Sequence, residues 1–137
     1  MEAVEILNQH KLRVTNTRLL VLNFLMAQQK AFSHSDLEAK FSKQINRVSI
    51  YRVLYAFLAC KILCKFVDSN ARVLYVFSAH SQHLDEHPHF KCNQCDQVIH
   101  LPQLPEDYIA LLREHQVEQL HLLVEGVCKD CLGGRES

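Results

Sequence analysis

Residues 46–77 have the sequence NRVSIYRVLYAFLACKILCKFVDSNARVLYVF, and this stretch decides the fold that we expect. Its first half repeats apolar side chains at i, i+3, i+4, i+7 and i+8, which is the stripe of one amphipathic helix: Ile50, Val53, Leu54, Phe57 and Leu58. Its second half changes to two β-type runs, 63–67 and 72–77, around the turn residues 68–71. Helices that lead into a β-hairpin are typical of a winged helix-turn-helix.

Three further helices are expected before this stretch. Residues 2–10 carry several apolar side chains and predict a short first helix. Either Thr15 or Asn16 can cap a second helix, which we expect to be buried on most of its circumference. Ser33 and Asp36 have the spacing of a capping box ahead of a third helix that ends near residue 41. These elements predict a winged-helix domain over residues 1–78.

The chain beyond residue 78 changes in character. Residues 79–89 (AHSQHLDEHPH) contain almost no large apolar side chain, and we expect a histidine-rich hinge there. Beyond the hinge, strand-like runs at 90–92, 98–101 and 117–125 and a helix at about 105–115 predict a second, smaller domain over 90–137. The predicted fold class is therefore α+β, a winged helix-turn-helix followed by a small α/β domain.

A formal charge of zero hides two oppositely charged halves. Residues 1–78 hold 11 Lys or Arg against 5 Asp or Glu, whereas residues 79–137 hold 4 against 10. A basic half suits the phosphates of a nucleic acid. The acidic half also holds seven of the nine histidines, and this mixture of carboxylates and imidazoles suits the binding of a cation.

Four of the six cysteines form two CxxC pairs, Cys92 with Cys95 and Cys128 with Cys131. Four such thiolates match the tetrahedral site of a structural zinc ion, which we predict here. A redox CxxC is the alternative, but it belongs with a thioredoxin-like βαβ pattern that this sequence does not have. We expect the remaining pair, Cys60 and Cys64, to pack as small apolar side chains.

A second constellation precedes the first CxxC pair. Alternate residues of an extended segment point the same way, so His87 and His89 can approach one ion. His80, His83 and His100 lie nearby in the sequence. Imidazole and carboxylate ligands accommodate zinc, iron or manganese, and such a site exchanges its metal more readily than a four-cysteine site. The alternative is that these are surface histidines without function.

The polar face of the helix after Asn46 offers donors for phosphates and base edges together with aromatic surface. Its candidate DNA-binding residues are Arg47, Ser49, Tyr51, Arg52 and Tyr55. A charged helix face is more often only solvated. The expected wing and the basic N-terminal half favour DNA contact over that alternative.

Four motifs occur in one order along nearly the whole chain: HKLRVT at 10–15 followed by Arg18, VSIYRVL at 48–54, HPHFKCNQC at 87–95 and GVCKDC at 126–131. Together they resemble the ferric uptake regulator family of bacterial metalloregulators, with its zinc-uptake-regulator branch as a candidate. The resemblance implies a homodimer that binds palindromic double-stranded DNA through the winged helices and dimerises through the α/β domain. Metal at the hinge would set the angle between the two DNA-reading heads.

The same resemblance assigns roles to individual residues. It places the structural zinc on the four CxxC cysteines and the sensor metal on His87 and His89, and it adds Arg13 and Arg18 to the DNA-binding set. A family carboxylate is replaced here by His100, which favours zinc over iron or manganese as the second metal. Three residues compete for a further ligand position: Asp68, His80 and His83.

These features predict a metal-dependent transcriptional regulator, with repression favoured. The alternative is a winged-helix DNA-binding protein that has structural zinc and senses no metal. A metalloenzyme is disfavoured because no Glu stands as a general base in an HExxH-type helix, so we expect neither catalysis nor a small-molecule substrate. No segment approaches the ~20 apolar residues that span a bilayer, and the acidic start of the chain predicts a cytoplasmic protein without a membrane partner.

Overall fold

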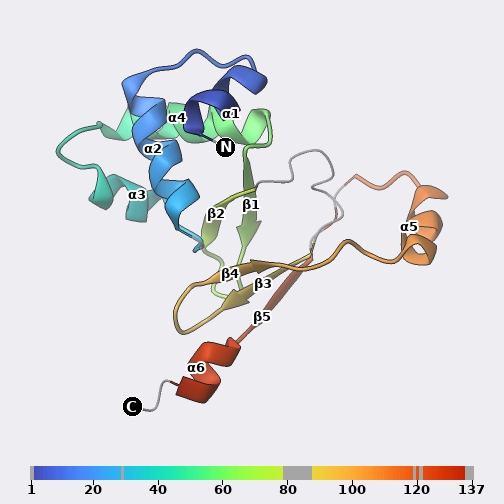
Figure 1. Cartoon of the computed structure of the whole chain (residues 1–137). Helices are drawn as coiled ribbons and strands as arrows, with labels where there is room; N and C mark the ends of the chain where they lie inside the picture. The colour runs from blue at the N-terminus through green and yellow to red at the C-terminus, as the bar shows by residue number, and fades with distance from the viewer. Residues whose placement is uncertain (1, 29, 79–87, 119, 121, 135–137) are drawn as a thin grey trace.

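The computed structural model describes residues 2–28, 30–78, 88–118, 120 and 122–134. Its first part is made of helices α1 (Ala3–Gln9), α2 (Asn16–Ala27), α3 (His34–Lys40) and α4 (Arg47–Ala59). Strands β1 (Leu63–Val67) and β2 (Val73–Phe77) follow as a hairpin. Figure 1 shows the four helices gathered at one end of the molecule, with the hairpin extending away from them.

Side-chain caps begin three of these helices, and the sequence predicts the first two of them. Thr15, rather than Asn16, caps α2 by accepting the Arg18 N–H at 3.2 Å. Ser33 and Asp36 close the predicted capping box on α3. In α4 the Asn46 side chain accepts the Ser49 N–H at 2.8 Å. Each cap satisfies a backbone donor that the helix leaves without an internal partner.

The predicted stripe on α4 forms the centre of the first core. Ile50, Val53, Leu54 and Phe57 are buried, and Leu58 packs against them half-buried. They meet buried side chains from α1, α2 and α3, among them Leu7, Leu22, Leu25 and Leu37. Burial of one such side chain stabilises the fold by about 1.5–3 kcal/mol, so this cluster holds α4 in a fixed place with its polar face outward.

The second part of the chain forms a three-stranded sheet in the order β4-β3-β5. Strand β3 (His89–Cys92) pairs antiparallel with β4 (Val98–His100) and parallel with β5 (Leu123–Gly126). Helix α5 (Glu106–Arg113) lies between β4 and β5 in the sequence, and α6 (Lys129–Gly134) follows β5. The predicted α+β class, with a helix-turn-helix and wing before a small α/β part, is confirmed.

Two details differ from the sequence-based expectation. The predicted strand at 117–125 is shorter, because β5 pairs with the four residues of β3 and extends only over that length. Helix α6 was not predicted at all. Of the predicted hinge, residues 79–87 lie outside the described residues.

The hairpin connects the two parts. On one side, Phe32 and Tyr75 exchange backbone hydrogen bonds of 2.9 and 2.8 Å, which tie β2 to the segment before α3. A small apolar cluster lies between the hairpin and β4, and its buried members are Ala31, Leu74, Val76 and Val98. The wing is therefore packed against both the helices and the C-terminal sheet. In the described part of the chain, no helix is both long and apolar enough to cross a membrane.

Candidate metal centre and DNA-binding surface

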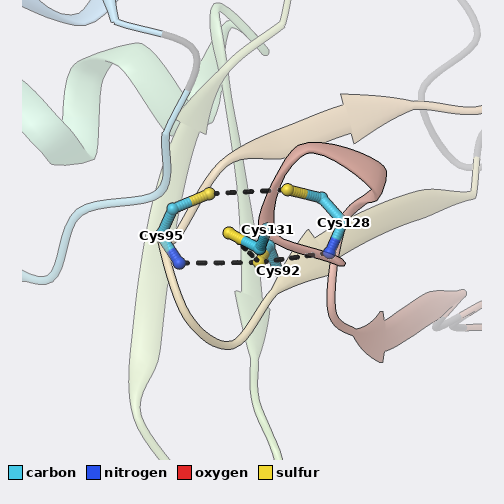
Figure 2. A group of neighbouring side chains, drawn as sticks. All are labelled: Cys92, Cys95, Cys128 and Cys131. Atoms are coloured by element: carbon cyan, nitrogen blue, oxygen red, sulfur yellow. Dashed lines mark hydrogen bonds between the residues drawn. The ribbon is translucent and has the colours of Figure 1, made fainter. Parts of the chain in front are cut away.

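The four CxxC cysteines come together at the end of the C-terminal sheet. Cys92 ends β3, Cys95 follows in a tight turn, and Cys128 and Cys131 lie at the start of α6 (Figure 2). Their four sulfur atoms lie within 4.8 Å of one another, and two pairs of Sγ atoms are 3.8 Å apart. Sulfurs bonded to a tetrahedral zinc at about 2.3 Å are about 3.8 Å apart, so the quartet fits a structural zinc ion.

Backbone donors prepare Cys92 to be a thiolate. Its Sγ accepts the N–H groups of Gln94, Cys95 and Cys128 at 3.3, 3.5 and 3.3 Å. Burial alone raises the pKa of a thiol, but these hydrogen bonds outweigh it and lower the pKa of Cys92 to about 6. Since a metal binds the thiolate form, this geometry favours binding at neutral pH.

The surroundings of the quartet are apolar. Cys92, Cys128 and Cys131 are buried, and Phe90 and Val127 pack against them. A closed, solvent-poor site with four protein ligands leaves no position for a substrate, so its chemistry is structural. Cys60 and Cys64 lie elsewhere, each half-buried against an apolar cluster, as the sequence predicts.

Of the predicted sensor histidines, the structure brings two together. His89 of β3 lies opposite His100 of β4 in the antiparallel register, and their ring centroids are 4.7 Å apart. His89 is buried, with Phe66 of the wing 5.9 Å from its ring, whereas His100 is exposed. The pair thus lies on the sheet, and His89 faces the wing. His80, His83 and His87 lie outside the described residues.

Asp68 is occupied by the wing turn. Its Oδ1 accepts the N–H groups of Asn70 and Arg72, both at 2.9 Å, and its Oδ2 accepts Arg72 Nε at 3.0 Å. Burial raises the pKa of Asp68, but these hydrogen bonds and the Arg72 charge lower it below its ordinary value. Among the described residues, only the cysteine quartet gathers three or more ligand-type side chains around one point, so Asp68 is not brought to the histidine pair.

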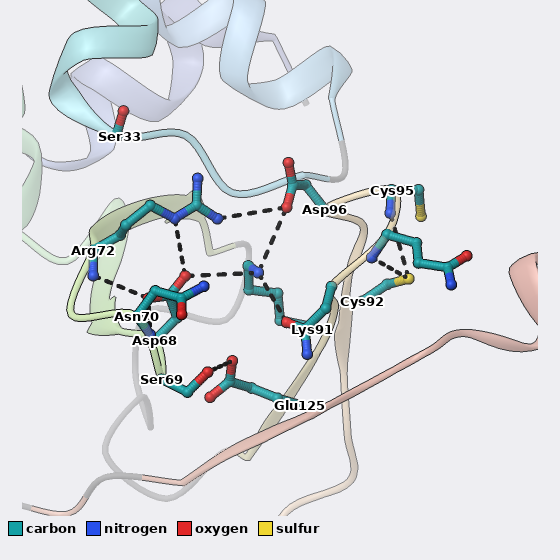
Figure 3. Close-up of polar contacts among 12 residues, drawn as sticks. Ser33, Asp68, Ser69, Asn70, Arg72, Lys91, Cys92, Cys95, Asp96 and Glu125 are labelled. Atoms are coloured by element: carbon teal, nitrogen blue, oxygen red, sulfur yellow. Dashed lines mark hydrogen bonds and ion pairs between the residues drawn. The ribbon is translucent and has the colours of Figure 1, made fainter.

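Asp68 also belongs to a set of four charged side chains that joins the wing to the sheet, which we call the wing cluster: Asp68, Arg72, Lys91 and Asp96 (Figure 3). Lys91 Nζ lies 3.8 Å from Asp68 Oδ2 and 3.5 Å from Asp96 Oδ1, and Arg72 Nη2 lies 3.7 Å from Asp96 Oδ1. Lys91 is only 2% exposed. Because Asp96 follows Cys95, the cluster connects the wing directly to the turn that holds two zinc ligands.

Lys91 was not among the residues that the sequence predicted for the site. The only signal was a lysine between Phe90 and Cys92 in a short apolar strand, where a charged side chain needs a partner if the strand is buried.

The candidate DNA-binding side chains lie on the outer face of α4. Tyr51 is 56% and Tyr55 77% exposed; Arg47 and Arg52 are exposed too, and Ser49 is half-buried. Arg18, at the start of α2, donates from Nη1 to the Arg13 carbonyl oxygen at 2.7 Å. Arg18 therefore orders the turn that presents the exposed Arg13. These residues offer cations, hydroxyls and aromatic rings on the helical side of the molecule.

Comparisons with known proteins agree on the family and the fold. A sequence model of the ferric uptake regulator family matches residues 9–125. Among solved structures, a zinc uptake regulator complexed with zinc and DNA is 22% identical, with a TM-score of 0.74 over 98% of this chain and 93% of that one.

Two further structures have the same fold. The ferric uptake regulator of Vibrio cholerae is 25% identical, with a TM-score of 0.61 over 90% of this chain and 98% of that one. The ferric uptake regulator of Pseudomonas aeruginosa, solved with manganese, is 19% identical, with a TM-score of 0.63 over 94% and 99%. No curated protein matches the chain by sequence.

Proposed function

Because the chain belongs to the ferric uptake regulator family, we propose that it is a metal-dependent transcriptional repressor of metal homeostasis that senses zinc in preference to iron. The observation that carries this proposal is the position of the wing. Its side chains pack in the same core as α4, which presents Tyr51 and Arg52, and its Phe66 lies against the buried sensor candidate His89. A metal bound by His89 would therefore lie next to Phe66, a residue of the DNA-binding domain.

The two metal sites have different tasks in this proposal. Cys92, Cys95, Cys128 and Cys131 hold a permanent zinc that fixes β3 to α6. His89 and His100, completed by His87, hold the exchangeable ion. A set of imidazoles favours zinc over manganese, since nitrogen ligands suit zinc and oxygen ligands suit manganese. The solved zinc uptake regulator that resembles this chain supports the same choice.

A second copy of the chain completes the DNA-binding unit. Strand β5 is an edge strand of its sheet, and apolar side chains near it are exposed, including Val124 at 48% and Leu132 at 71%. An unpaired edge with apolar neighbours is suited to pairing with its own copy. The domain over residues 90–137 then dimerises, and the two domains over 1–78 bind successive half-sites of a palindrome in the cytoplasm.

The DNA-binding set contains three groups of side chains. Tyr51, Tyr55 and Ser49 contact base edges, and Arg47 and Arg52, exposed cations of the same helix, contact phosphates. Arg13, ordered by Arg18, contacts the DNA backbone beside the helix.

Binding of DNA with one and with two zinc ions per chain tests the proposal. A duplex would first be selected from a random library, and its affinity then measured by fluorescence anisotropy. We expect the second zinc to tighten binding about tenfold or more in the wild type. His89→Ala should lose this effect while keeping the first zinc, and the matched control His115→Ala, at an exposed position, should keep it. Equal affinity with one and two zinc ions would instead indicate structural zinc without sensing.

A further inference from the structure

His34, the first residue of α3, lies under one of the proposed DNA-reading side chains. Its ring centroid is 3.9 Å from that of Tyr51 on α4, and the two ring planes are inclined by 34°. The His34 side chain is only 14% exposed, whereas Tyr51 is 56% exposed. The imidazole is therefore a platform on which the exposed phenol ring rests.

Glu38, one turn along α3, fixes this platform. Its Oε2 pairs with His34 Nδ1 and lies 3.5 Å from Arg47 Nε on α4. A hydrogen bond between Nδ1–H and a carboxylate sets the tautomer and the orientation of the imidazole ring. The Glu38 carboxylate thus contacts both the imidazole under Tyr51 and the guanidinium of Arg47.

His34 itself is not placed to contact DNA. Its Nε2 atom is buried and has no hydrogen-bond partner among the described residues. The imidazole can thus act on bound DNA only through the side chain that covers it.

We propose that His34 and Glu38 are positioning residues for DNA recognition. His34, fixed by Glu38, holds Tyr51 in the orientation that the base edges require, and Glu38 also holds Arg47 for its phosphate contact. The inference rests on the proposed DNA-binding function. An exposed tyrosine loses rotational freedom when it binds, and a side chain already held in place loses less. Because the His34 stack orients Tyr51 for base contacts, it should raise the affinity for the operator more than the affinity for unrelated DNA.

The test compares His34→Ala with His34→Phe and with the control His115→Ala. Affinities for the selected operator and for an unrelated duplex would be measured at one salt concentration with saturating zinc. We expect His34→Ala to weaken operator binding about threefold to tenfold, the equivalent of immobilising one additional side chain on binding. Binding of the unrelated duplex should stay unchanged, whereas the melting temperature should fall by a few degrees because the imidazole also packs in the free protein. His34→Phe restores a ring beneath Tyr51 and should recover most of the loss.

A double variant separates positioning from simple helix packing. If His34 acts through Tyr51, adding His34→Ala to Tyr51→Ala should cause no further loss of operator affinity. Independent losses, or equal weakening on both duplexes, would overturn the inference. A wild-type protein that selects no duplex overturns the proposed function, whereas operator binding left unaffected in His34→Ala overturns this inference alone.

Discussion

Removal of the Asp68 charge should destabilise the protein far more than removal of the lysine that it faces. In Asp68→Asn the amide oxygen still accepts the Asn70 and Arg72 N–H groups, so the wing turn is kept. The buried Lys91 ammonium, however, then keeps only one carboxylate, that of Asp96, whose side chain is 45% exposed, together with a neutral acceptor, Asn93 Oδ1, at 3.3 Å. Breaking a buried ion pair from one side costs about 3–5 kcal/mol, and since one partner remains we expect about 2–3 kcal/mol.

The reverse change leaves no buried charge without a partner. In Lys91→Met, Asp68 keeps the Arg72 guanidinium at 3.0 Å and both backbone donors, so we expect a cost of about 1 kcal/mol or less. The double variant should lose about as little free energy of unfolding as Lys91→Met alone, because it no longer contains the Lys91 ammonium that Asp68→Asn leaves without its partner. This corresponds to a coupling free energy of about 2 kcal/mol between the two positions.

Urea unfolding at pH 7, with saturating zinc and one fixed protein concentration, measures these differences. The pKa of Asp68 is lowered in the folded state, so its contribution is present at pH values above the ordinary 3.8 and is lost as the pH falls through the folded value. At pH 7 the full effect is expected. Glu125→Gln is the control, because its bond to Ser69 is exposed and should matter little. Equal costs for Asp68→Asn and Lys91→Met would refute the role of the wing cluster.

Three further predictions concern the metal, the dimer and the DNA. The logarithm of the zinc affinity of the quartet should fall more steeply below pH 6 than above it, by about one additional unit per pH unit, because the pKa of Cys92 is about 6 and its thiolate becomes protonated there. Chelator competition from pH 5 to 8 measures this slope, and an unchanged slope across pH 6 refutes the prediction. Val124→Asp should convert dimers to monomers in sedimentation, because it places a charge on the exposed face of the edge strand; persistent dimers would exclude this edge. Arg52→Ala should weaken operator and unrelated DNA alike and lower the salt slope by about one, as expected of a phosphate contact; selective loss of operator binding would assign Arg52 to a base instead.

The local features of the fold were predictable because short stretches of sequence determine them. The spacing of Ile50, Val53 and Phe57 fixes the buried face of α4, and Ser33 with Asp36 fixes the start of α3. The cysteine quartet was predictable for a related reason, since each CxxC pair turns on itself and zinc accepts four such sulfurs. None of these inferences needs knowledge of how distant segments meet.

Features that depend on distant segments were not predictable. The length of β5 follows from its partner β3, and the burial of Lys91 follows from the wing turn that covers it. The stacking of His34 on Tyr51 depends on how α3 packs against α4. In each case the deciding partner lies more than 15 residues away in the chain and no periodicity marks it.

Metal sensing requires that the sensor metal and the operator strengthen each other's binding by the same factor. Zinc titrations by calorimetry, with the cysteine quartet already filled, would give the affinity of the second zinc in the absence and in the presence of saturating operator. We predict that the operator tightens this zinc about tenfold or more, by the same factor by which the zinc tightens operator binding. A second zinc whose affinity is the same with and without operator would contradict the proposed regulation by metal.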